Sequence, residues 1–296
     1  MTKDVSLKVF SKKININKGL YIIATPIGNI SDITIRALKI FEKSDTIVCE
    51  DTRVSKRLFN LLGIEIRTKN WLIYNDHSQE KDIVVVMNEL KKGKIVSLIS
   101  DAGTPLISDP GYKLVNHIIK KNYNVYSIPG PCSAIASLAL SGLRTDKFFF
   151  IGFLPKNKND YVSILRNYSN LKCSLIIYEK PKRLNFLFEK IKENCKNFKI
   201  VVIKELTKVY EETIAVSSKN IEDYIKKKKI LKGELTVIVE IIDNVNKIYT
   251  DKEILFELKK LKPSQVSAML SKSSSESREI LYKRCMRILY EKNNKK

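Results

Sequence analysis

The loop at residues 101–111 carries the side chains with the clearest capacity for chemistry. It places two aspartates, two glycines and two prolines directly after an apolar run. The carboxylate of Asp101, at the end of that run, can accept hydrogen bonds from ribose hydroxyls or from an ammonium group. Gly103 has no Cβ, so a ligand can approach its backbone closely. A tight turn with a capping aspartate is the alternative interpretation.

A second polar group, Glu50-Asp51-Thr52-Arg53, follows the apolar run at 46–49. Two carboxylates beside an arginine can orient a hydroxyl, accept its proton and stabilise developing charge. The same residues also suit a helix start, with Asp51 or Thr52 as the N-cap and Glu50 near the positive end of the helix dipole. Their spacing leaves both interpretations open.

Several familiar chemical motifs are absent from the sequence. It has no G-x-G-x-x-G and no G-x-x-x-x-G-K-[ST], so neither a Rossmann dinucleotide site nor a P-loop is indicated. It also lacks the G-x-S-x-G elbow of α/β-hydrolases. The five cysteines form no C-x-x-C, and His77 and His117 lie far apart. We therefore expect neither a disulfide framework nor a metal site.

The polar loops follow strands that alternate with helices. Buried strands are predicted by four apolar runs, at 19–24, 46–49, 94–100 and 124–128. A helical pattern follows each run, which predicts βαβ units and a mostly parallel sheet covered on both faces. Right-handed crossovers then bring to one edge of this sheet the loops at Thr25, Glu50, Asp101 and Pro129. That edge is where open α/β sheets bind ligands.

A second block begins near Phe148. Its predicted strands are at 148–154, 174–178, 200–203 and 235–242, and the last has the continuous apolar start of a central strand. Helical patterns follow at 253–260, 263–270 and 276–290. We therefore predict a basic tail at 1–18, an α/β domain at 19–128, a second α/β domain at 129–245 and a helical tail at 246–296.

Composition and charge restrict the class of protein. Of the 296 residues, 44% are hydrophobic and 29% are charged, which excludes a disordered, collagen-like or polytopic membrane chain. No run of 18 apolar residues and no secretory signal is present, so we expect a cytoplasmic protein without a membrane partner. The net charge of +22 indicates a polyanionic partner such as nucleic acid. An AT-biased coding sequence, rich in Lys, Ile and Asn codons, is the alternative explanation.

The same motifs resemble those of the bacterial 16S ribosomal RNA ribose 2′-O-methyltransferases, a family that modifies a cytidine in the decoding centre. The resemblance extends from about Gly19 to Glu240 and is carried by residues 20–29, 33–38, 50–53, 100–111, 129–131, 141–143, 152–155, 178–179, 205–208 and 232–234. It implies the tetrapyrrole methylase fold, with two α/β domains and a cleft between them. It also implies S-adenosylmethionine (SAM) as methyl donor and a homodimer that acts on 16S rRNA. We expect that rRNA within the small ribosomal subunit, with free rRNA as the alternative.

The resemblance also implies roles for individual residues. SAM is expected along Thr25, Pro26, Asp101, Gly103, Thr104, Gly130, Ser133, Tyr178, Gly233 and Glu234. For catalysis we expect Asp51 or Glu50 to orient the hydroxyl or accept its proton, with Arg53 holding a carboxylate or a phosphate. The residues expected to contact RNA phosphates are Lys156, Lys158, Lys182, Arg183 and Lys208, for each of which solvated surface is the alternative.

This sequence departs from the family pattern at three places, one of which is beside Arg183, where Lys180 and Lys182 replace uncharged or weakly basic residues and keep or strengthen the expected RNA affinity. Cys132-Ser133 stands where Ser-Ala is usual, and residues 74–79 lack a histidine and a glutamate that relatives often carry. Two other functions remain open at this point. One is a tetrapyrrole methyltransferase on the same fold. The other is a non-enzymatic RNA- or DNA-binding protein that uses its C-terminal helices, which have helix-turn-helix spacing.

Overall fold

A computed structural model describes residues 15–169, 173–227, 232–244, 248–271, 274 and 276–293. The chain divides into two compact units. Unit 1 runs to Ala136 and takes in Glu205–Glu211, and unit 2 comprises Ser137–Lys204 and the chain from Glu212 onward. The domain limits expected from the sequence, at residues 128 and 245, stay predictions beside this division.

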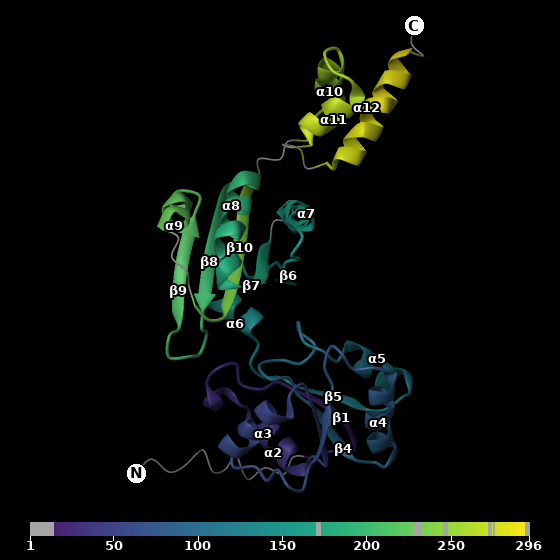
Figure 1. The fold of residues 1–296 in the computed structure, drawn as a ribbon, viewed down its shortest axis with the longest axis vertical. Coiled ribbons are helices and arrows are strands. Elements are labelled where there is room, and N and C mark those ends of the chain that lie inside the picture. Colours follow the sequence, from purple (N-terminus) through teal and green to yellow (C-terminus); the bar gives the residue numbers. More distant parts are fainter. Residues whose placement is uncertain are drawn as a thin grey trace. The chain divides into compact units, whose positions relative to one another are not determined.

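Unit 1 is an α/β unit with one parallel sheet (Figure 1). Its strands are β1 (Gly19–Ile23), β2 (Thr46–Cys49), β3 (Asn70–Ile73), β4 (Ile95–Leu98) and β5 (Val125–Ile128), in the order β3-β2-β4-β1-β5. The helices are η1 (Ile30–Asp32), α2 (Ile35–Lys43), α3 (Thr52–Leu61), α4 (Glu80–Lys91), α5 (Tyr112–Lys120) and α6 (Ser133–Leu140), the last of which crosses the boundary between the units. The predicted parallel sheet is confirmed for this unit.

Alternation along β1 explains why helices cover both faces of this sheet. Leu20 packs with residues of α4 and α5 on one face, whereas Tyr21 and Ile23 pack with residues of α2 and α3 on the other. Successive strand residues point to opposite faces, so both faces need apolar side chains and the strand reads as a continuous apolar run. On the second face the ring of Phe59 lies 4.8 Å from that of Phe41 and 5.1 Å from that of Trp71.

Unit 2 holds a mixed sheet in the order β6-β7-β10-β8-β9. Its strands are β6 (Phe148–Phe153), β7 (Ser174–Glu179), β8 (Cys195–Lys204), β9 (Glu212–Ser217) and β10 (Leu235–Asn244), with helices α7 (Lys158–Ser169), η2 (Pro181–Arg183), α8 (Leu184–Asn194) and α9 (Ile221–Lys227). β10 is central, as predicted, but only β6 and β7 pair in parallel. The described residues 205–211 between β8 and β9 contain no helix, and a direct connection of this kind joins antiparallel strands.

The C-terminal helices of unit 2 have a hydrophobic cluster of their own. α10 (Asp251–Leu258), α11 (Pro263–Leu270) and α12 (Arg278–Asn293) bury Ile254, Val266 and Leu281 together. Arg284 donates hydrogen bonds to Asp251 and Glu276, which ties α12 to the start of α10 and to the segment before α12. The three predicted helices are therefore confirmed.

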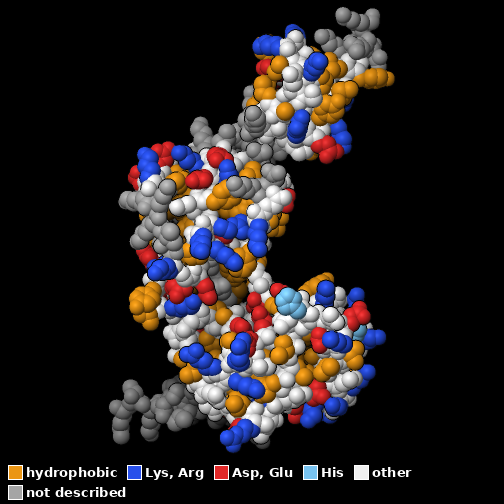
Figure 2. Space-filling view, viewed as in Figure 1, with side chains coloured by type: hydrophobic (Ala, Val, Ile, Leu, Met, Phe, Trp, Pro, Cys, Tyr) orange, Lys and Arg blue, Asp and Glu red, His pale blue; other side chains and the backbone are white. Residues whose placement is uncertain are grey.

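Basic side chains are spread over the surface. In the view of Figure 2, Lys and Arg side chains are scattered over unit 1, over the sheet region of unit 2 and over its C-terminal helices. Among the described helices, none is both long enough and apolar enough to span a bilayer.

The ring contacts of Phe59 with Phe41 and Trp71 lead to a prediction about stability. Phe59→Ala removes a fully buried ring, so we expect the free energy of unfolding of unit 1 to fall by about 3–5 kcal/mol. Leu61→Ala on the same helix is the control, because Leu61 is 67% exposed. Urea unfolding followed by the fluorescence of Trp71, the single tryptophan, reports on this unit. Equal midpoints for the two variants would contradict the packing described.

Candidate active site

The candidate active site lies where the strands of unit 1 end. Because all of these strands are parallel, their carboxyl ends share one edge of the sheet. The loops after β1, β2, β4 and β5 carry the predicted residues Thr25, Glu50, Asp101 and Gly130. The predicted convergence of these loops at one edge is therefore confirmed.

Hydrogen bonds join three of these loops to one another. The Thr25 amide donates to the Gly103 carbonyl at 2.9 Å, and the Gly103 amide donates to the Thr25 carbonyl at 3.1 Å. The buried Thr25 hydroxyl also donates to the Ser100 carbonyl at 3.1 Å. The Thr104 hydroxyl donates to the Pro131 carbonyl at 2.9 Å, which adds the loop after β5. The hydroxyls of Thr25 and Thr104 therefore hold neighbouring loops together through these hydrogen bonds.

Two glycines among the predicted cofactor residues stand where a side chain does not fit. Gly103 has φ +85°, and a Cβ built on it lies 3.2 Å from Ile27 Cγ2. A Cβ on Gly130 lies 2.9 Å from the Cβ of Ala24. Pro26 is half-buried in the first loop, and Ser133 begins α6 after the third. Because both residues are glycines, no side chain of their own covers the backbone at these two positions of the sheet edge.

A cluster of carboxylates lies at the same edge. Burial, and then the charges of Asp109 and Asp101, raise the pKa of Glu50 to about 7, although a hydrogen bond from the Asp101 amide opposes the change. Burial also raises the pKa of Asp101, against a hydrogen bond from the Asp51 amide. The pKa of Asp109 is raised by burial too, against a hydrogen bond with Ser100. Glu50 can therefore gain or lose a proton near neutral pH.

Asp51, the next residue along the chain, is in the opposite electrostatic state. It is the N-cap of α3, where its carboxylate accepts a hydrogen bond from the Arg53 amide at 2.8 Å. The same carboxylate makes a two-point contact with the Arg53 guanidinium, at 2.6 Å from Nη2 and 3.0 Å from Nε. These hydrogen bonds lower the pKa of Asp51 to about 2. The capping interpretation of Asp51 is confirmed, and Arg53, whose side chain is 90% exposed, holds this carboxylate.

The remaining predicted cofactor residues belong to unit 2, where they are neighbours. Tyr178, near the end of β7, pairs with Thr236 near the start of β10. Gly233 and Glu234 directly precede β10, and Gly233 has φ +94°. The ring of Tyr178 packs against that of Phe153 at 5.5 Å. One end of the unit 2 sheet therefore holds all three.

Arg183, predicted to contact RNA, is engaged within unit 2. Its guanidinium donates to the carbonyls of Leu154 and Pro155 at 3.1 and 2.7 Å. It also lies 3.4 Å from the buried carboxylate of Glu179, whose pKa burial raises. The ring of Tyr161 lies 5.1 Å from the same guanidinium. Arg183 thus holds the turn after β6 in place.

The other predicted RNA contacts differ in their surroundings. Lys156 and Lys182 are exposed. Lys208 forms an ion pair with Glu205 at 3.1 Å. Lys158 is the first residue of α7, but its side chain lies outside the described residues.

Sequence reasoning missed two features of this region: the place of Asp109 in the carboxylate cluster, and the packing of the segment that contains the family motif at 205–208. Asp109 joins the carboxylate cluster, and its place in the same loop as Asp101 was the available signal. The segment Glu205–Glu211 packs on Gly28, since a Cβ there would lie 2.5 Å from Lys208 Cγ and 2.8 Å from Thr207 Oγ1. Thr207 has φ +66°, which no sequence pattern for threonine indicates.

Within the described residues, no three His, Cys, Asp or Glu side chains are arranged to hold a metal ion.

Comparison with solved structures supports the fold. The methyltransferase CobJ has a TM-score of 0.58 at 13% identity, with 79% of this chain and 97% of that chain covered. The uroporphyrin-III C-methyltransferase from Thermus thermophilus, solved with S-adenosylhomocysteine, has a TM-score of 0.52 at 14% identity, covering 75% and 97% of the two chains. At these identities the similarity shows the fold alone.

Comparison of sequences is more specific. The model of the Tetrapyrrole (Corrin/Porphyrin) Methylases matches residues 19–222. Ribosomal RNA small subunit methyltransferase I of Rickettsia prowazekii (strain Madrid E) is 45% identical over 224 residues, which are 76% of this chain and 79% of that protein. The protein of the same name from Thermotoga maritima is 37% identical and covers 74% of this chain and 97% of its own length. These matches confirm the resemblance seen in the motifs: the chain belongs to the ribosomal RNA small subunit methyltransferase I family, within the tetrapyrrole methylases.

Proposed function

We propose that this protein transfers a methyl group from SAM to the ribose 2′-hydroxyl of a cytidine in the decoding region of 16S rRNA. Membership of the methyltransferase family supports the reaction class and the RNA substrate. The observation that carries the chemistry is the position of Glu50, a carboxyl group that titrates near neutral pH beside Asp101 at the edge of the unit 1 sheet.

The residues present fit SAM. Gly103 and Gly130 keep side chains away from the backbone at the sheet edge, and Asp101 is exposed there with a carboxylate that can bind ribose hydroxyls or the ammonium group. When bound, SAM supplies an electrophilic methyl group. Pro26 and Ser133 complete the proposed contacts in unit 1, where Thr25 and Thr104 hold the loops. Tyr178, Gly233 and Glu234 in unit 2 remain proposed contacts as well.

Glu50 is the better proton acceptor of the two neighbouring carboxylates. A base must release its proton again near the working pH, and a carboxyl with a pKa of about 7 does so. Asp51 has a pKa of about 2, and its oxygens are occupied by the Arg53 amide and guanidinium. We therefore assign proton transfer to Glu50. Asp51 positions the start of α3, and its amide hydrogen bond helps to position Asp101.

Electrostatics supports a nucleic-acid substrate. The chain carries a net charge of +22, and phosphate contacts supply most of the sequence-independent affinity for RNA. Lys156 and Lys182 are the proposed phosphate contacts with exposed side chains, and Lys158 and Lys208 are proposed beside them. Arg183 acts on this surface by fixing the turn that precedes Lys156. We also propose that the protein is a cytoplasmic homodimer that acts on 16S rRNA within the small subunit.

A direct assay tests the function. The protein is incubated with SAM labelled in its methyl group and with small ribosomal subunits, free 16S rRNA or a uroporphyrinogen. We expect label in the small subunits, in a nucleotide that resists alkaline cleavage because its 2′-oxygen is methylated. Label in the tetrapyrrole alone would identify a small-molecule methyltransferase, and label in no arm would contradict an enzymatic function.

The assignment of Asp101 predicts an effect on donor binding. Asp101→Asn removes a charged acceptor, so we expect SAM affinity measured by calorimetry to fall roughly tenfold to a hundredfold. Asp223→Asn, at an exposed position on α9, is the matched control and should bind SAM like the unaltered protein. Equal affinities for both variants would remove Asp101 from the donor site.

The assignment of Glu50 predicts a pH dependence. Only the ionised carboxylate accepts a proton, so the single-turnover rate should rise from pH 6 to pH 8 with a midpoint at about 7. Glu50→Gln should lower the rate by about 10²–10⁴ and abolish this rise.

Asp51→Asn is the control for this measurement. Asp51 stays ionised through the whole pH range, so the midpoint should remain near neutral in that variant. A flat profile for the unaltered protein, or a rise that survives in Glu50→Gln, would show that Glu50 is not the acceptor.

A further inference from the structure

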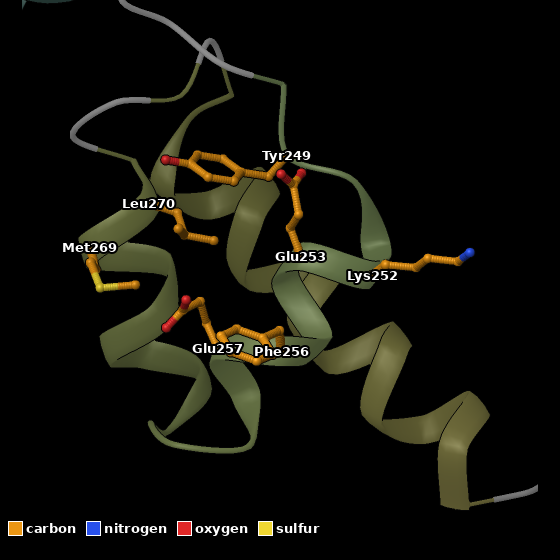
Figure 3. A pocket seen from close by; sticks show the side chains of 7 residues that line it. All are labelled: Tyr249, Lys252, Glu253, Phe256, Glu257, Met269 and Leu270. Atoms are coloured by element: carbon orange, nitrogen blue, oxygen red, sulfur yellow. The ribbon is translucent and has the colours of Figure 1, made fainter.

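The C-terminal helices form a pocket that the proposed methyl transfer does not use. It lies between α10 and α11 and has a volume of roughly 450 Å³, within the usual range for small-ligand sites (Figure 3). The residues lining it are Tyr249, Lys252, Glu253, Phe256, Glu257, Met269 and Leu270. All of them lie in one stretch of unit 2, residues 249–270.

The apolar part of the lining is left open to solvent. Phe256 is 53% exposed and Met269 is 39% exposed, although the same helices bury Ile254 and Val266 completely. The two exposed side chains are therefore not needed to fill the hydrophobic cluster. Exposed aromatic and methionine side chains beside a concave surface are typical of binding sites, because they offer flat and adaptable apolar contacts.

Two lysines lie on or near α10, of which Lys252 lines the pocket and Lys260 lies over the ring of Phe256. Lys252, Phe256 and Lys260 are spaced four residues apart, which places Lys252 and Phe256 on one face of α10 and Lys260 just beyond its end. Lys260 Nζ lies 4.2 Å from the centre of the Phe256 ring. In Figure 3 Lys252 extends outward from the rim. In the part of the chain that the structure describes, neither lysine is paired with a carboxylate, so both can bind an anion.

The two glutamates that line the pocket have different surroundings. Glu253 accepts hydrogen bonds from the Thr250 amide and hydroxyl at 2.8 and 3.0 Å, which completes the capping box of α10. Glu257 lies beside Phe256 in Figure 3, on the pocket side of α10. A carboxylate at the edge of an apolar slot accepts hydrogen bonds from amino groups, including the exocyclic amino group of cytosine.

We propose that this pocket binds an unpaired nucleotide of the RNA substrate. The base stacks on Phe256 against Met269, its amino group donates to Glu257, and Lys252 and Lys260 bind the adjoining phosphates. An apolar slot with one lysine in its rim and a second over its aromatic ring suits this ligand, because every base has an apolar face and every linkage has a negative charge. The inference rests on the proposed function for the identity of the RNA, and it gives the helical tail a substrate-binding role separate from the chemistry.

The test is a binding experiment with the full-length chain and no SAM. Fluorescein-labelled hexacytidylate and hexauridylate are titrated at low salt, and anisotropy gives the dissociation constants. Phe256→Ala should weaken hexacytidylate binding about tenfold or more, as loss of one stacked base does. Tyr282→Ala is the matched control, because Tyr282 is 42% exposed on α12 and does not line the pocket. Its affinity should equal that of the unaltered protein.

Two further variants identify the contacts. Glu257→Ala should remove any preference for hexacytidylate over hexauridylate, because uracil has no exocyclic amino group. Lys252→Glu should weaken both oligonucleotides and reduce the dependence of affinity on salt. Circular dichroism of each variant confirms that the helices are intact.

The outcomes separate this proposal from the proposed function. If the protein methylates small subunits but Phe256→Ala binds RNA as Tyr282→Ala does, the nucleotide pocket is wrong and the enzyme assignment stands. If it methylates no RNA, the enzyme assignment is wrong, while the binding comparison still decides whether the pocket holds a nucleotide. If Phe256→Ala leaves RNA binding unchanged and alters only the oligomeric state measured by light scattering, the pocket belongs to a contact between copies and the proposal is overturned.

Discussion

The candidate active site depends on the pair of hydrogen bonds between Thr25 and Gly103. Strands β1 and β4 are neighbours in the sheet, but a parallel sheet leaves the loops beyond its edge unpaired. The reciprocal bonds between the Thr25 and Gly103 backbones extend the order of the sheet into those loops. Gly103 can take part because its φ of +85° is open to glycine, and no side chain collides with Ile27. The position of Asp101, two residues before Gly103, follows from this connection.

Apolar burial around the sheet compensates for the unfavourable arrangement of charges at its edge. Glu50, Asp101 and Asp109 repel one another, and each is partly removed from water. The same loop holds Leu106 and Ser108 with positive φ, at 73° and 62°, which costs of the order of 1–3 kcal/mol for each residue. Apolar clusters on both faces of the sheet stabilise the fold against these costs. Strain and repulsion are therefore concentrated where the proposed chemistry takes place.

Sequence patterns predicted the strands and helices that are strongly apolar and missed strands at the margin of a sheet. Strands β2 and β10 and helices α6 and α11 form where their patterns indicated. The strand β3 was missed because it lies at the sheet edge, where only part of its surface is covered. Arg183 was predicted to contact an RNA phosphate, with solvated surface as the alternative, but its partners are carbonyls of Leu154 and Pro155, which lie nearly thirty residues away. Pairing across such distances has no local signal.

The roles of Glu50 and Asp51 show most clearly why a motif does not fix its chemistry. Both are carboxylates directly after β2, and their spacing alone does not favour either as the proton acceptor. The chain turns into α3 between them, so Asp51 receives the amide and guanidinium hydrogen bonds of Arg53, which stabilise its charge. Glu50 remains at the sheet edge, where burial and the charges of Asp109 and Asp101 destabilise its charge. One peptide unit therefore separates an N-cap that is ionised at neutral pH from a group able to exchange protons there.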